Sequence, residues 1–117
     1  MTYGKKRSVV TATACCLWAA LATSCLADMT VETLLQNRTS DVTKLYLVGV
    51  IDGIEWANAF QEFHKQQKIF CSPKDTALNT DQYINVLNDY IQKMPRNKSG
   101  EVGAVLMDAL MTTYPCP

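Results

Sequence analysis

The sequence predicts an all-α fold, a small four-helix domain over residues 28–117 that is stapled by one disulfide bond. Three observations support this fold class. After residue 30, apolar residues recur at spacings of three and four, which is the period of an amphipathic helix. No segment alternates apolar and polar residues at a period of two, so we expect no sheet. The few prolines fall where the helical patterns stop.

Residues 1–27 have the three parts of a secretory signal peptide. A basic start, Lys5-Lys6-Arg7, precedes an uncharged run of apolar and small residues, and Cys25-Leu26-Ala27 is a small-x-small cleavage pattern. We therefore predict cleavage after Ala27. An uncleaved membrane anchor is one alternative. Lipidation at Cys25 is another, although the leucine usual three residues before a lipidated cysteine is missing.

Cleavage would change the charge and the cysteine content of the chain. Eight basic residues would remain against 11 acidic ones, giving a net charge near −3. This charge argues against nucleic-acid binding and against a polybasic membrane patch. Of the five cysteines only Cys71 and Cys116 would remain, and an even number of thiols in an exported domain predicts a disulfide. A bridge between Cys71 and Cys116 would close a long loop and would stabilise the folded domain by about 4 kcal/mol. This is comparable to the whole stability that the core of so small a domain can supply.

The first two helices are expected at residues 30–36 and about 40–64. Thr30 can cap the first, and Ser40 or Asp41 can cap the second after a polar turn. The face that each helix should bury is read from its apolar spacing. These faces are Val31, Leu34 and Leu35 in the first helix, and Leu47, Val50, Ile51, Ile54, Ala57 and Phe60 in the second.

A loop from Gln66 to Ala77 separates these helices from two more. Asn79 or Thr80 can cap a third helix that ends at Met94, before the breaking segment Pro95–Gly100. The fourth helix is expected from about Ser99 to Thr113, with Pro115 after it. Their inward residues are Tyr83, Val86, Leu87, Tyr90 and Ile91 in the third helix, and Val102, Val105, Leu106, Ala109 and Leu110 in the fourth.

Residues that could carry chemistry are too few for a catalytic or metal site. His64 and Cys71 are near each other in sequence, but Cys71 has a partner in Cys116. Asp52 and Glu55 lack further ligands for a metal ion. We expect no enzymatic activity, metal or cofactor. Gly49-x-x-x-Gly53 is a close-packing motif, and we expect it to let another helix approach within the domain.

An ordered set of motifs resembles the Rap-type (Rap/Tai-like) immunity proteins of type VI secretion systems. The motifs are Tyr46-x-x-Gly49-Val50-x-Asp52-Gly53, Phe70-Cys71-x-Pro73, Gln82 with Met94-Pro95, Ala104 with Ala109-Leu110, and Tyr114-Pro115-Cys116. The resemblance implies a helical periplasmic protein without enzymatic activity. It implies a protein that binds and blocks a cognate amidase effector, which would otherwise cut peptidoglycan peptide stems, and that forms homodimers. The Cys71 and Cys116 motifs look like the structural bridge of the family. Two further cysteines that many members carry are absent near Gln36 and near Thr43.

For the effector-binding surface we expect the loop 66–77 with Lys74 and Asp75 at its tip. Polar residues of the third helix, Asp81, Asn85 and Asp89, should surround it. The turn after that helix, with Arg96, is the competing candidate. A second function remains open, a general periplasmic chaperone or envelope-interaction protein that binds broadly and has no toxin partner. No membrane contact is expected of the mature domain unless Cys25 is lipidated.

Overall fold

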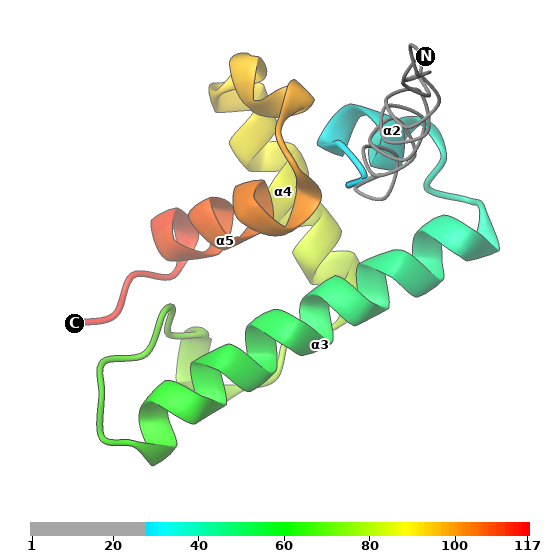
Figure 1. Ribbon diagram of the computed structural model, residues 1–117. Helices are drawn as coiled ribbons and strands as arrows, with labels where there is room; N and C mark the ends of the chain where they lie inside the picture. The colour runs from blue at the N-terminus through cyan, green and yellow to red at the C-terminus, as the bar shows by residue number, and fades with distance from the viewer. Residues whose placement is uncertain (1–27) are drawn as a thin grey trace, which may run out of the picture.

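The computed structural model describes residues 28–117, so the predicted signal peptide lies outside it, as does the side chain of Asp75. The elements are α2 (Val31–Gln36), α3 (Asp41–Phe63), the 3₁₀ turn η1 (Pro73–Asp75), α4 (Thr80–Lys93), the 3₁₀ segment η2 (Pro95–Ser99) and α5 (Val102–Thr113) (Figure 1). Over these residues the fold is all-α with four α-helices, as predicted. The β-type pairing found within 28–117 is a single isolated bridge between Thr30 and Glu101.

Side-chain caps start two of the helices where the sequence predicts them. The Thr30 hydroxyl accepts a hydrogen bond from the Thr33 amide at 3.3 Å. Asn79 and Gln82 form a capping box at the start of α4, each side chain accepting from the other residue's backbone amide, at 2.9 and 2.8 Å. Such reciprocal bonds satisfy amides that the first turn of a helix leaves without partners.

The long helix α3 ends in a Schellman motif. The Gln66 amide donates to the Gln61 carbonyl at 2.8 Å, and the Lys65 amide donates to the Glu62 carbonyl at 2.9 Å. Lys65 has a φ of 55°, the left-handed conformation that this motif requires and that glycine usually supplies. The motif turns the chain sharply away from α3 into the loop 66–77.

One hydrophobic core joins all four helices, and α3 lies along one edge of the molecule (Figure 1). In α3 the expected inward residues Leu47, Ile51 and Ile54 are buried. Phe60 is 61% exposed, so the prediction that it faces inward was wrong. The buried apolar residues are Val31, Leu34, Leu47, Ile51, Ile54, Phe70, Tyr83, Val86, Leu87, Ile91, Val102, Val105, Leu106, Ala109 and Leu110.

The start of the domain pairs with the segment between η2 and α5. The Val31 amide donates to the Gly100 carbonyl, and the Val102 amide donates to the Met29 carbonyl, both at 3.0 Å. This pairing holds Gly100 and Glu101 in extended conformation, so α5 begins at Val102 and not near Ser99 as expected. Among the described residues, none of the helices combines the length and the hydropathy needed to cross a membrane.

Candidate partner-binding surface

The Cys71–Cys116 disulfide ties the loop after α3 to the C-terminal end of the chain. The two sulfur atoms are 2.08 Å apart, so the predicted bridge is formed. The Cys71 amide also donates to the Tyr114 carbonyl at 2.8 Å. Cys71 is therefore fixed in place by one covalent bond and one hydrogen bond. Because its sulfur is in a disulfide, Cys71 cannot act as a thiolate nucleophile.

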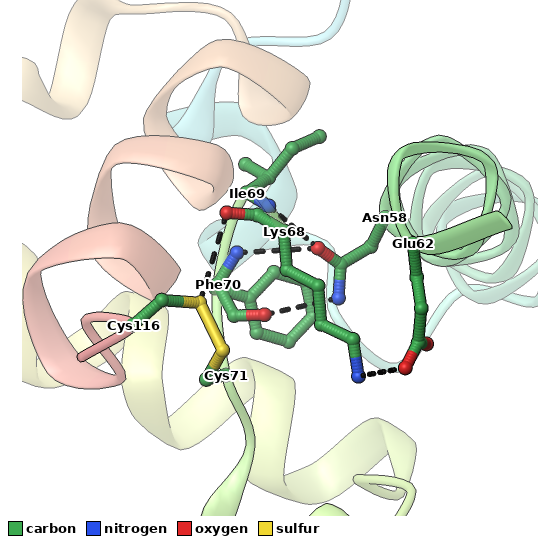
Figure 2. Close-up of a disulfide and its surroundings, with 7 residues drawn as sticks. All are labelled: Asn58, Glu62, Lys68, Ile69, Phe70, Cys71 and Cys116. Atoms are coloured by element: carbon green, nitrogen blue, oxygen red, sulfur yellow. Dashed lines mark hydrogen bonds and ion pairs between the residues drawn. A yellow bond between two sulfur atoms is a disulfide. The ribbon is translucent and has the colours of Figure 1, made fainter. Parts of the chain in front are cut away.

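Asn58 holds the same loop from the side of α3. Its buried amide nitrogen donates to the Phe70 carbonyl at 3.0 Å, and its oxygen accepts from the Ile69 and Phe70 amides at 2.7 and 3.2 Å (Figure 2). The Phe70 ring is buried in the core. Lys68 Nζ lies 3.0 Å from Glu62 Oε1, a second link to α3. Residues 68–71 are therefore braced between α3 and the C-terminal tail.

The part of the loop beyond this brace carries the predicted tip. Lys74 lies in η1, is exposed, and has a φ of 56°, which is costly for a residue with a side chain. Such a conformation persists where the surrounding structure determines it. The loop thus presents Lys74 on a short 3₁₀ turn whose base cannot move freely.

The exposed face of α4 borders a groove that sequence reasoning did not foresee. Asp81 and Asn85 line a hollow of about 560 Å³ together with Arg38 and Lys44, which come from the α2–α3 turn and from α3. A narrower apolar pit of about 240 Å³ adjoins it and shares Arg38 and Lys44. Asp89 is exposed on α4 but does not line the groove. No local signal marks Arg38 as a neighbour of α4, since only the packing of α2 against the rest brings it there.

The competing candidate, Arg96, lies in η2 at the opposite end of α4. A helix of 14 residues is about 21 Å long, so Arg96 is well separated from Asp81 at the other end. Arg96 and Lys74 are both exposed. The structure therefore presents the two candidate loops as separate sites and not as one.

A second exposed surface lies on α3, on the side away from the core. Its large apolar residues are Val42, Leu45, Val48, Trp56, Phe60 and Phe63. Trp56, Phe60, Phe63 and His64 line a hollow of about 490 Å³, and His64 lies against both phenylalanine rings, at 4.2 and 5.4 Å between centroids. Gly49 and Gly53 share this side. A Cβ atom on either would meet nothing within 4 Å, so the prediction that another helix of the domain approaches them was wrong.

The acidic residues of α3 have different surroundings from one another. Asp52 is exposed, whereas Glu55 accepts a hydrogen bond from the hydroxyl of the buried Tyr83. Burial, reinforced by this bond and by the Glu55 charge, raises the pKa of Tyr83 above its ordinary value. Within residues 28–117, no three His, Cys, Asp or Glu side chains are grouped so that they could hold a metal ion.

One comparison with known proteins gives a match. The family model of the Rap1a immunity proteins matches residues 13–116, which is most of the chain. No curated protein and no solved structure shows significant similarity.

Proposed function

The chain belongs to the Rap1a immunity protein family, and on this premise we propose that it binds and inhibits a cognate type VI secreted peptidoglycan amidase. It needs no catalytic residues or cofactor for this role, because the proposed activity is the blocking of another protein's cleft. We propose further that it acts in the periplasm and as a homodimer.

The observation that carries the proposal is the braced loop. An inhibitor that enters a substrate cleft needs a protrusion that keeps its shape, because ordering a flexible loop on binding costs free energy. Asn58 and the Cys71–Cys116 bond hold the base of this loop from two sides. Lys74 stands beyond the brace, and the groove with Asp81 and Asn85 flanks the start of α4. We propose Lys74 and Asp75 as the inserting tip, with Asp81, Asn85 and Asp89 as the surrounding surface.

Export is the second part of the proposal. Residues 1–27 would direct the chain to the periplasm and be removed after Ala27, leaving residues 28–117 as the working domain. The periplasm is oxidising, so the Cys71–Cys116 bond that braces the loop can form and persist there. Mass spectrometry of protein recovered from the periplasm tests this. A chain that starts at Asp28 supports cleavage after Ala27. A lipid-modified Cys25 identifies the protein as a lipoprotein. A mass equal to that of the full 117-residue chain indicates an uncleaved membrane anchor.

Where an amidase is encoded beside this chain, its inhibition by the purified protein tests the function. Lys74→Ala and Asp75→Ala should each weaken inhibition at least tenfold, whereas Arg96→Ala, at the far end of α4, should inhibit as the wild type does. Each variant must first show the wild-type circular dichroism spectrum. If only Arg96→Ala loses inhibition, the η2 segment is the binding site. If the wild type binds many proteins weakly and has no neighbouring amidase, the alternative of a general envelope chaperone replaces the immunity function.

A further inference from the structure

Seven residues of α3 form an exposed stripe that the domain itself does not use. We define the α3 stripe as Val42, Leu45, Gly49, Gly53, Trp56, Phe60 and Phe63. At about 100° per residue, these positions fall within an arc of about 80°. The arc lies opposite the buried residues Leu47, Ile51, Ile54 and Asn58 of the same helix. The five large side chains of the stripe are between 61% and 84% exposed.

We propose that the α3 stripe pairs with the α3 stripe of a second copy, antiparallel, with the two-fold axis between Asp52 and Gly53. This inference rests on the homodimer proposed above and deepens it by assigning its interface, orientation and register. A two-fold interface uses the same surface of both copies, so each residue must face a complementary one. In this register Val42 faces Phe63, Leu45 faces Phe60, and Gly49 faces Trp56.

The pairing of Gly49 with Trp56 is the main reason for this register. Trp56 is the largest side chain of the stripe, and Gly49 is a position where a side chain is missing and where the protomer leaves open space. Antiparallel pairing seats each Trp56 over the Gly49 of the other copy, twice in one interface. Small residues on a shared helix face let two helices approach closely. Glycine is also among the poorest helix formers, so two glycines unused within the protomer indicate a need outside it.

The exposed apolar area of the stripe is large enough for an interface with a second copy of the chain. A ring residue contributes roughly 150–250 Å² when buried, so Trp56, Phe60 and Phe63 together leave on the order of 400–500 Å² exposed. Val42 and Leu45, each about three-quarters exposed, add to this area. A standard interface buries about 800 Å² on each partner, and interfaces of homodimers are rich in apolar surface. Pairing α3 over its length of about 34 Å supplies an interface of this kind.

One charge near the stripe opposes the pairing, but only weakly. Asp52 is the charged residue closest to the midpoint, and it lies at the edge of the stripe. In the proposed register the two copies bring their Asp52 side chains near the axis, exposed to solvent. The resulting repulsion is modest in water, because exposed charges are screened. Asp52→Asn should therefore strengthen association, whereas Asp89→Asn, on the exposed side of α4, should leave it unchanged.

The oligomeric state tests the proposal. The full chain is expressed with export, and protein purified from the periplasm is measured by sedimentation equilibrium. We expect a dimer for the wild type and at least a tenfold higher dissociation constant for Gly49→Leu. Because a Cβ atom at position 49 would meet nothing within 4 Å in the protomer, this variant should keep its helical spectrum and its melting point. Ala104→Leu is the matched control, since Ala104 is an exposed position on α5. A monomeric wild type at 100 µM, or a Gly49→Leu variant that associates like the wild type, overturns the proposal.

Cross-linking tests the register independently. Val42 and Phe63 lie 21 residues apart on one helix, about 32 Å, so cysteines at these positions cannot bond within a chain. Differently tagged Val42→Cys and Phe63→Cys chains, expressed together, should form a mixed disulfide, and neither should cross-link alone. Cross-linking of Val42→Cys with itself would mean parallel pairing and overturn the proposed orientation.

Amidase inhibition separates this inference from the proposed function. If the wild type is monomeric and Gly49→Leu loses inhibition, the stripe binds the effector, so the dimer fails while the immunity function stands. If the protein is a dimer in the proposed register but inhibits no amidase, the interface stands and the function fails.

Discussion

The buried amide group of Asn58 bonds to both backbone polar atoms of Phe70, donating to its carbonyl at 3.0 Å and accepting from its amide at 3.2 Å. The same oxygen accepts from the Ile69 amide. One polar side chain of α3 therefore supplies hydrogen-bond partners to three backbone groups of a segment that belongs to no helix or strand. Backbone groups at such a depth need partners, because a buried group without one is costly.

Asn58→Ala should lower the free energy of unfolding by about 2–4 kcal/mol, since it removes partners from buried backbone groups and leaves space behind. Urea unfolding followed by circular dichroism measures this. Asn85→Ala is the control, because Asn85 is exposed on α4, and it should change stability by less than about 0.5 kcal/mol. Equal effects of the two substitutions would show that the Asn58 bonds contribute little.

Loss of the disulfide should lower stability by about 2–5 kcal/mol, the usual effect of removing a native bridge from a small domain. Cys71→Ser and the double variant Cys71→Ser with Cys116→Ser should behave alike, since either change breaks the same bond. Mass spectrometry of non-reduced peptides should find residues 71 and 116 linked in protein from the periplasm. Free thiols in that protein, or a double variant as stable as the wild type, would contradict this.

Gly100→Ala should destabilise the domain by about 1–3 kcal/mol through crowding. An added Cβ would meet a Val105 methyl carbon at 2.7 Å and the Asn97 carbonyl oxygen at 3.2 Å. Gly103→Ala is the matched control, because its Cβ would reach the Val50 side chain at an ordinary 3.8 Å. Within α5 that change should raise stability by up to about 1 kcal/mol. Thermal unfolding of both variants measures these changes in stability. A Gly100→Ala variant as stable as the wild type would show that the added Cβ atom is not crowded.

Stability should fall at alkaline pH because of Tyr83. The pKa of this phenol is raised in the folded protein, first by burial and then by Glu55, above the value of about 10 that applies in the unfolded chain. Its contribution is therefore complete below pH 10 and is lost as the pH rises further, because the unfolded chain then releases this proton more readily. Urea unfolding between pH 8 and pH 11 measures the slope.

Two variants identify the source of that slope. Tyr83→Phe should remove the part due to this group, and Glu55→Gln should reduce it without abolishing it, because burial is the larger cause. An alkaline slope that is unchanged in Tyr83→Phe would assign the effect to other groups.

Local features of the sequence determined the four helices, the side-chain caps of α2 and α4, and the disulfide. The cap expected at the start of α3 is different, because Ser40 makes no side-chain cap hydrogen bond there. Asn79 and Gln82 stand three residues apart, and the capping box they form depends only on that spacing. Counting the cysteines outside the predicted signal peptide was enough to pair Cys71 with Cys116. The buried faces of α4 and α5 were also predictable, because each of these helices has one apolar face that alone can enter the core.

Only the tertiary structure decided which side of α3 is buried at its C-terminal end. This helix is apolar on two opposite faces, and periodicity measures spacing along a helix without showing which face meets the core. Phe60 was therefore assigned inward, whereas the buried position belongs to Asn58. A polar residue can take that place because residues 69 and 70 return to bond with it, and that return depends on the whole fold. The position of Arg38 beside the α4 groove and the hydrogen bond from Tyr83 to Glu55 have the same origin, since each depends on elements that meet only after packing.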